Sequence, residues 1–463
     1  MFWTVVQVEA RNLRAERGLW GLLILLVLLV AGAAVSGAAS VRARQVVVAD
    51  AVLAEQARLE AARTRLAAAG EAKSLRDDPG DPVAAGRMVG HLAVLPPAPL
   101  AALARGQGDW LVDSARITTD SRLGARGAEA AISGPTVQST GAFDLAFVFV
   151  YLLPLLIIAL SYDLLAGERE RGTLALVLSQ PVSLMTFVLG KACLRAVVVV
   201  GVTLVLAGAA LLLSADGLAT PAGLTQAALY LGALLAYALF WFAAAVAVNA
   251  RGKSAAGNAL ALVGLWLVLV VAVPGLVRMV VEVSHPPPSR VELANLVREA
   301  ASEIEEELTE IEGDHGQAAP AGLRLLAVQD ALDQRIQPVI EGFREQLTRQ
   351  QNLVNRLRFL SPALVLNEAV VDLAGTGGEA TRRFEAQADA FHQQWRAFFV
   401  ERARANQRLT PADYAGLPKF VFEPEPLASQ GGRVGLGILG LILPALVLVV
   451  VSTPRLRRVG RMA

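Results

Sequence analysis

The chain has 463 residues, 54% of them hydrophobic, and its mean hydropathy is +0.50. This composition is too apolar for a soluble enzyme of this length and predicts a membrane protein. The net charge of +1 gives no support for nucleic acid as a partner, because basic and acidic residues are sorted by segment. The single cysteine, Cys193, excludes disulfide bonds within the chain as the force that holds the polar segments together.

Residues 1–18 are polar and carry three arginines, which predicts a cytosolic N-terminus before a first membrane span at 19–40. The small residues that end this apolar run could also form a signal-peptide cleavage site. The run is longer than a signal-peptide core of about 7 to 15 residues, so we favour an uncleaved span.

A first polar insert occupies 41–142. Its first part, to about Ala69, is rich in Ala, Glu, Arg and Leu and lacks Pro and Gly, which predicts a helix that continues out of the membrane. The remainder has Pro-rich and Gly-rich stretches without a clear period, so neither its fold nor its role is predicted.

The second span, 143–164, is followed by a cytosolic segment, 165–186, that turns abruptly polar. The charged residues at 168–171 cannot lie in hydrocarbon at low cost, so the span must end before them. Glu168 and Arg171 are about one turn apart if the segment is helical, and such exposed pairs stabilise a helix by only a few tenths of a kcal/mol.

After Gly172 and Thr173, the apolar residues from Leu174 to Leu178 predict a very short second helix that Pro181 ends. Because this helix is apolar on nearly every side, it needs a groove to lie in. The groove belongs either to a partner protein or to the chain's own bundle, and the sequence leaves both alternatives open.

Three further spans are predicted at 187–214, 223–248 and 256–282. The link between the spans 223–248 and 256–282 is basic and is assigned to the cytosol. The link between the spans 187–214 and 223–248 is not basic and is assigned to the outside. Small residues in these spans predict close helix packing. Kinks are predicted at the prolines inside the second, fifth and sixth spans, which are Pro154, Pro274 and Pro444.

The second insert, 283–431, is predicted to be helical because its apolar residues recur with a 3.6-residue period. Ser361 and Thr410 each precede a proline, as a helix N-cap often does. The acidic run near Glu303 predicts a solvated helix face rather than a metal site. A stripe of aromatic residues at helical spacing predicts a hydrophobic core, and its members are Phe384, Phe391, Trp395 and Phe398.

The last span, 432–452, is followed by a basic tail, 453–463, which predicts a cytosolic C-terminus. Six spans place both termini, the polar segment 165–186 and the basic link on the same side of the membrane. The predicted fold is an all-α integral membrane protein with six transmembrane helices and a mainly helical extracytoplasmic domain built from two inserts.

The chain lacks the motifs that would give it chemistry of its own. It has no Gly-x-x-x-x-Gly-Lys phosphate-binding loop and no His-Glu-x-x-His zinc motif. Its predicted spans also lack central Asp, Glu, Lys or Arg, which proton-coupled and ion-coupled transporters use as relays. We therefore expect no enzyme activity, no bound cofactor or metal, and an energy source outside this chain.

A series of residues surrounds the end of the second span: Asp163, Gly167, Glu168, Glu170, Gly172, Thr173, Leu174, Ser179, Pro181, Val182, Ser183, Gly190 and Lys191. This series resembles the cytoplasmic signature of ATP-binding-cassette (ABC) exporter permeases of the second type. The long insert before the last span is similar to the subgroup with a large periplasmic domain. The resemblance covers essentially the whole chain.

The resemblance implies a permease subunit in the bacterial inner membrane, paired with a second permease, identical or paralogous. Two copies of a separate ATP-binding subunit would bind ATP and magnesium and drive the exporter. Coupling contacts to that subunit are implied for Glu168, Glu170, Arg171, Gly172, Thr173, Leu174, Leu176 and Pro181.

Two alternatives stay open at this point. ATPase motion could be relayed to a periplasmic partner without transport across the membrane. The chain could also be a membrane-anchored envelope sensor or scaffold, which would have no ATPase partner.

Overall fold

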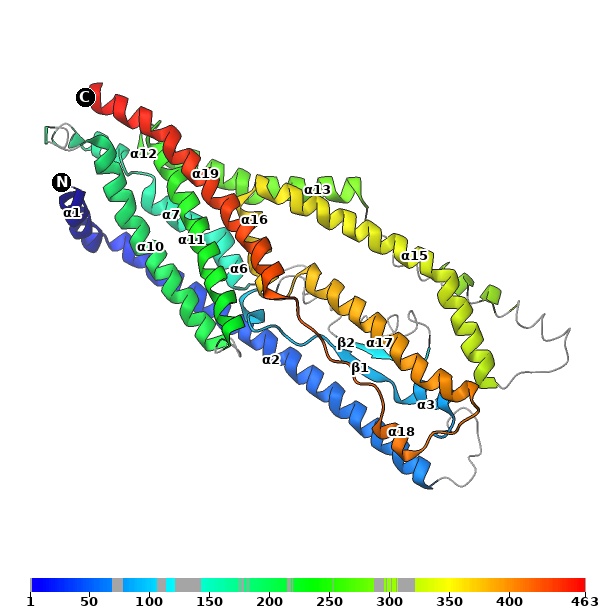
Figure 1. The fold of residues 1–463 in the computed structure, drawn as a ribbon. Coiled ribbons are helices and arrows are strands. Elements are labelled where there is room, and N and C mark those ends of the chain that lie inside the picture. Colours follow the sequence, from blue (N-terminus) through cyan, green and yellow to red (C-terminus); the bar gives the residue numbers. More distant parts are fainter. Residues whose placement is uncertain are drawn as a thin grey trace.

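The computed structural model of the protein describes residues 2–68, 78–105, 114–120, 143–174, 176, 179–180, 183–214, 218, 220–252, 254–286, 295–296, 298–300, 302–304, 306 and 321–462. Within them, six helices are long and apolar enough to cross a membrane. These helices cover Arg17–Ala67, Leu145–Glu170, Leu184–Leu213, Pro221–Asn249, Ala255–Ser284 and Leu427–Leu456. The predicted all-α membrane fold is confirmed. A mainly helical domain, here called the projecting domain, extends from one end of the bundle (Figure 1).

The bundle is organised around α11. Its elements in chain order are α1 (Phe2–Ala15), α2 (Arg17–Ala68), α6 (Leu145–Phe147), η3 (Val148–Leu152), α7 (Leu153–Ser161), α8 (Ala166–Glu170), α10 (Leu184–Ser214), α11 (Pro221–Asn249), α12 (Ala255–Trp266), η4 (Leu267–Ala272), α13 (Val273–Ser284) and α19 (Leu427–Met462). Helix α11 contacts α7, α10 and α19, and buries Tyr230, Tyr237 and Trp241. An added Cβ at Gly232 would lie 3.6 Å from Ile438, so α11 and α19 approach closely here.

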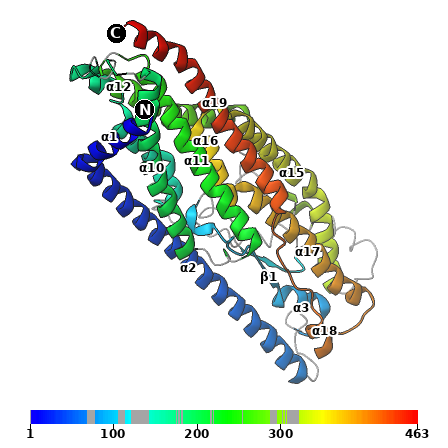
Figure 2. The ribbon, with the colours of Figure 1, turned by 60° about the vertical axis from the view of Figure 1, so that its left-hand side comes forward.

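Helix α2 is one continuous helix of 52 residues. The prediction that a helix continues beyond the first span to about Ala69 is therefore confirmed. Its first part packs on α10, and its last part packs on elements of the projecting domain. Figures 1 and 2 show α2 running from the bundle along one side of that domain. A movement of the first span is thereby connected to the projecting domain through a single helix.

Pro154 and Pro274 each follow a short π-helical segment, η3 and η4. Proline cannot donate to the carbonyl one turn earlier and its ring clashes with that carbonyl, so a widened turn relieves the conflict. The carbonyl oxygens near the prolines are satisfied from other helices. Tyr237 donates to the Val150 carbonyl at 2.6 Å, and Ser361 donates to the Leu269 carbonyl at 2.5 Å.

Helix α16 (Pro362–Leu373) lies inside the bundle although it belongs to the second insert. It packs on α11 and α19 and also contacts η3 and η4 (Figure 1). Leu366 and Leu373 are 0% exposed, because α16 is apolar on most sides. The sequence analysis predicted a helical insert at 283–431, but it did not predict that one of its helices packs back into the bundle.

The projecting domain contains a small antiparallel sheet between helices. Its elements are α3 (Pro82–Val89), β1 (His91–Val94), η1 (Ala101–Leu103), β2 (Ser114–Ile117), α15 (Ala321–Leu357), η5 (Arg358–Leu360), α17 (Gly378–Arg404) and α18 (Pro411–Ala415). In the sheet, His91 pairs with Ile117 and Val94 pairs with Ser114. Helix α2 contacts β1 and α17 contacts β2. Four residues per strand are too few for a periodic signal in the sequence, so these strands were not predicted.

Three of the four residues of the predicted aromatic stripe lie in the core of the projecting domain, whereas Phe398 is only partly buried and Phe399 takes the fourth core position. Phe384, Phe391 and Trp395 are 2%, 4% and 1% exposed and pack with Ala62 of α2 in one hydrophobic cluster. The predicted N-caps are also confirmed: the side chain of Ser361 accepts from Leu364 N, and that of Thr410 accepts from Asp413 N. Most of the acidic run near Glu303 lies outside the described residues.

An arginine clamp joins α16 to the start of α19. Arg433 Nη2 lies 2.7 Å from Asp372 Oδ1, and Arg433 Nη1 lies 2.5 Å from Glu425 Oε1. These hydrogen bonds from Arg433 lower the pKa of Glu425 below its ordinary value. The pair of Glu425 and Arg433 therefore contributes its full stability above the ordinary carboxyl pKa and loses it as the pH falls through the lowered value. Burial raises the pKa of Asp372 above its ordinary value, so this pH dependence applies to the Glu425 pair alone.

Replacing Trp395 by Ala is expected to destabilise the projecting domain. The change opens a cavity in its core, which costs about 3 to 5 kcal/mol, and it removes the Nε1 hydrogen bond to the Gly86 carbonyl. The thermal unfolding temperature of the full chain in lipid nanodiscs should fall by several degrees. Leu347→Ala on α15, where Leu347 is 46% exposed, is the control and should have little effect. Equal unfolding temperatures for the two variants would contradict the assigned core.

Candidate functional site

The polar segment after α7, here called the α8 segment, is described at residues 162–174 and 176. It begins with a turn at Tyr162–Leu165 and continues as the short helix α8. The helix ends at Gly172, whose φ of +73° is accessible to glycine without strain. The Gly172 amide donates to the Arg169 carbonyl, and the Thr173 amide donates to the Glu168 carbonyl at 3.0 Å. The sequence predicted a break at Gly172 and an N-cap at Thr173, but the Thr173 hydroxyl bonds backward to the Glu168 carbonyl and carboxylate.

A buried ionic network joins this segment to two other helices. Arg195 of α10 lies 2.8 Å from Glu9 of α1 and 2.9 Å from Asp163, and it also donates to the Leu160 carbonyl. One turn earlier on α10, Lys191 Nζ lies 3.0 Å from Glu168 and 3.7 Å from Glu9. We call these five groups, Glu9, Asp163, Glu168, Lys191 and Arg195, the ionic network.

Three members of the ionic network are buried, whereas the side chains of Asp163 and Glu168 are 28% and 15% exposed. Glu9 and Lys191 are 3% exposed and Arg195 is 8% exposed. A buried ion pair contributes little net stability, because desolvation offsets the attraction. Removing one partner is costly, since it leaves the remaining charge buried and uncompensated. The network therefore fixes the relative positions of α1, the α8 segment and α10 more than it stabilises the fold.

Two buried asparagines hold the opposite side of the segment. Asn249, at the end of α11, donates to the Ser161 carbonyl at 2.8 Å and accepts from the Leu165 amide at 3.2 Å. Asn258 of α12 donates to the Tyr162 carbonyl and to Asn249 Oδ1, both at 3.1 Å. The turn after α7 is thus tied by hydrogen bonds to two further helices.

The charged face of α8 also contacts the start of α12. Glu170 accepts from the Ala255 amide at 2.7 Å, at a helix N-terminus that favours negative charge. Arg169 donates to the Gly252 carbonyl at 3.4 Å. A Cβ at Gly252 would lie 1.5 Å from Asn258 Oδ1, so this position requires glycine.

The residues predicted as a coupling site divide into two groups. Glu168 and Leu174 face inward, and Leu174 packs on α10 and α19 through Val188 and Leu456. Glu170 is exposed but bonds to the start of α12. The others that are described face outward, and they are Arg171, Gly172, Thr173 and Leu176. Pro181, together with Leu178, lies outside the described residues.

Docking of the short apolar helix on the chain's own bundle is confirmed for Leu174, whereas docking on a partner protein stays a prediction. Leu174 is 8% exposed and docks on the chain's own bundle, whereas Leu176 is 70% exposed. The predicted pair of Glu168 and Arg171 is present at 3.8 Å, but the principal partner of Glu168 is Lys191.

Sequence reasoning missed four residues of this site. Glu9 and Arg195 lie 186 positions apart, and Asn249 and Asn258 belong to spans that read as uniformly apolar. One signal was present: Arg195 follows Lys191 by four positions, which places both charges on the same face of α10.

The described residues hold no group of three or more His, Cys, Asp or Glu arranged to bind a metal ion.

Comparison with known proteins gives one match. A family model described as ABC-2 family transporter protein matches residues 3–458, which is nearly the whole chain. No curated protein matches the chain.

Replacing Arg195 by Met should destabilise the chain by about 3 to 5 kcal/mol, because Glu9 and Asp163 lose their buried partner. The unfolding temperature and the yield of monodisperse protein report the loss. Adding Glu9→Gln should restore part of it, since one uncompensated charge is removed. Arg171→Met, at a side chain 62% exposed, is the control. If both arginine variants behave alike, the ionic network does not position these helices.

Proposed function

This chain belongs to the ABC-2 transporter family of membrane permeases, and we propose that it is the permease subunit of an exporter driven by separate ATP-binding subunits. The ATP-binding subunits, in two copies, hydrolyse ATP with magnesium, and this chain moves the substrate. A second permease, identical or paralogous, completes the pathway. The chain itself carries no phosphate-binding loop, so the proposal assigns no catalysis to it.

One observation carries the proposal: the α8 segment is fixed to four helices and still presents an exposed tip. The ionic network ties it to α1 and α10, and the two asparagines tie it to α11 and α12. Beyond these anchors, Arg171, Gly172 and Leu176 are exposed. A partner that binds this tip and moves it would move the attached helices as well, as coupling requires.

The proposed location is the bacterial inner membrane, with both termini and the α8 segment in the cytosol. Two observations support this orientation. Arginines are concentrated in the N-terminal residues and in the C-terminal tail. Figure 1 places the N-terminus and the C-terminus at the same end of the bundle, away from the projecting domain.

A second candidate function is favoured by α2. This helix contains the first span, and its far part contributes Ala62 to the core of the projecting domain. Motion that enters at α1 and α10 would therefore reach the projecting domain without anything crossing the membrane. The chain would then act on a periplasmic partner by transmitting ATPase motion.

Replacing Leu176 by Asp should weaken binding of the ATP-binding subunit. A carboxylate cannot be buried in an apolar contact without a partner, and the position is 70% exposed, so the chain itself should still fold. Co-purification of an ATP-binding protein with the chain, together with ATPase activity, is the measurement. A reduction of about tenfold or more is expected for one lost hot-spot contact.

Arg349→Glu is the control for this experiment, because Arg349 is exposed on α15 in the projecting domain. It should leave co-purification unchanged. If no ATP-binding protein accompanies the wild-type chain, the sensor or scaffold function replaces the exporter. If Leu176→Asp retains its partner, the exposed tip is not the coupling contact.

The second candidate predicts that nucleotide changes the projecting domain through α2. In the complex, amide hydrogen exchange of the β1 residues Leu92 and Ala93 should differ between the ATP-bound and nucleotide-free states. Val47→Pro, at a position 68% exposed on α2 between the first span and the projecting domain, should remove this difference, because proline breaks the helix. Val47→Ala is the control. Exchange that is insensitive to nucleotide in the wild-type complex would exclude this transmission.

A further inference from the structure

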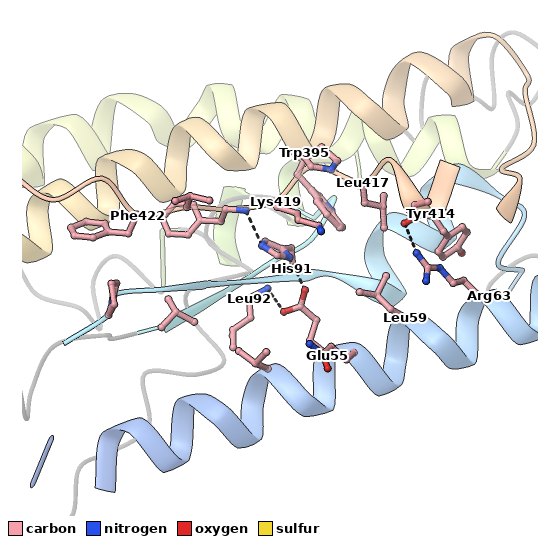
Figure 3. Close-up of a pocket in the computed structure, with 18 residues that line it drawn as sticks. Glu55, Leu59, Arg63, His91, Leu92, Trp395, Tyr414, Leu417, Lys419 and Phe422 are labelled. Atoms are coloured by element: carbon pink, nitrogen blue, oxygen red, sulfur yellow. Dashed lines mark hydrogen bonds and ion pairs between the residues drawn. The ribbon is translucent and has the colours of Figure 1, made fainter. Parts of the chain in front are cut away.

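The projecting domain contains a cavity of about 600 Å³, which lies within the range of sites that bind small organic molecules. One wall is α2 from Val52 to Arg63, and the opposite wall is the segment Tyr414–Phe422, here called the strap. Strand β1 forms the floor through His91 and Leu92, and Trp395 of α17 closes it from above (Figure 3).

The floor of the cavity is polar, but its hydrogen bonds are already made. Glu55 accepts from His91 Nδ1 at 2.6 Å and from the Leu92 amide at 3.0 Å. His91 Nε2 accepts from the Phe420 amide of the strap at 2.9 Å. An imidazole that donates through Nδ1 and accepts through Nε2 is the neutral tautomer. Glu55 therefore accepts from two donors of the protein itself, and its side chain is only 8% exposed.

Two cationic side chains, Arg63 and Lys419, line the cavity together with the largely buried Glu55. Lys419 of the strap is exposed, and no ion pair joins it to another described residue. Arg63 donates to the Tyr414 carbonyl at 3.1 Å, and its buried Nε has no hydrogen-bond partner in the part of the chain that the structure describes. Glu60 approaches Arg63 only to 3.7 Å, and its side chain is 72% exposed. Tyr414 adds no negative charge, because burial raises its pKa to about 12.

The apolar and cationic ends of the cavity are separate. Figure 3 shows Arg63 and Tyr414 at one end, Lys419 above His91, and Phe422 at the other end. Val52 lines the same apolar end, which is the end nearer the first span along α2. At 1.5 Å per residue, Val52 and Arg63 are roughly 16 Å apart along the helix. The cavity is thus elongated, with Arg63 at the end far from the bundle and Lys419 between the two ends.

We propose that this cavity binds an amphipathic anion: a single apolar chain with a carboxylate or phosphate head. The chain would lie against Val52, Leu59 and Phe422, and the head would pair with Lys419 and the Arg63 guanidinium. Because the strap leads into α19 and the opposite wall is continuous with the first span, the ligand would touch extensions of the first and last spans at once. Neither wall contains a residue of the coupling site, so the proposal does not depend on the proposed function.

Photo-crosslinking of the full chain in zwitterionic lipid nanodiscs tests this binding. The probe is a 12-carbon carboxylate that carries a diazirine near its methyl end, and peptide mass spectrometry locates the label. Labelling is expected in the α2 residues 52–63 and in the strap. Unlabelled dodecanoate should compete, whereas dodecanol and dodecyltrimethylammonium, which lack the negative head, should not. Competition by a lysophospholipid with an anionic head, compared with dodecanoate, distinguishes a lipid from a free fatty acid as the source.

Lys419→Glu should lower the labelling about tenfold, since an attractive charge becomes repulsive at an exposed position. Leu59→Trp should remove it by filling the cavity, and an unchanged unfolding temperature would show that this variant is folded. Arg349→Glu makes the same charge change outside the cavity and should label like the wild type. The proposal is overturned if Lys419→Glu labels like the wild type, if the cationic competitor works as well as dodecanoate, or if the label is spread over the projecting domain.

Discussion

Arg195 makes the contact on which the end of the bundle away from the projecting domain depends. Its guanidinium bridges Glu9 of α1 and Asp163 after α7, and Lys191 extends the same contacts to Glu168. In a membrane bundle, lipid is as apolar as the side chains, so the hydrophobic effect does little to orient one helix against another. Buried charges with few possible partners supply that orientation. Asp163, Glu168 and Lys191 belong to the residue series that resembles the family signature. Their contacts hold the segment after α7 in one position.

A second region of the bundle, around η3 and η4, is stabilised by hydrogen bonds between helices. Prolines in two spans leave carbonyl oxygens without their helical donors, and π-helical turns widen the backbone in front of them. Tyr237 and Ser361 then donate to these oxygens from other helices. Ser361 is the N-cap of α16, so the same residue starts a helix and holds it against the irregular part of a span. Backbone irregularity is tolerated here because the surrounding protein satisfies it.

Helix α2 connects these two regions to the projecting domain. It packs on α10 in the bundle and then forms one wall of the cavity, with Glu55 bonded to β1. Because α2 has no internal proline and no break, a displacement of one end along the helix axis also moves the other end. The strap on the other wall continues into α19, which is held at its start by the Arg433 clamp. The cavity therefore lies where the extensions of two spans meet.

Hydrophobic periodicity, charge distribution and capping residues are local properties, and from them the sequence predicted six spans, the helix beyond the first span, the caps at Ser361 and Thr410 and the aromatic core. The exposed tip at Leu176 was also predicted as part of the site. Glu9, Arg195, Asn249 and Asn258 were missed, because a polar residue far away in sequence acquires its role only when folding brings its partner to it. The burial of α16 and the short strands likewise have no local signal. The sequence alone determined which segments are apolar and helical, whereas only the tertiary structure decided which charges and carbonyls meet, since those pairings depend on long-range contacts that no local pattern specifies.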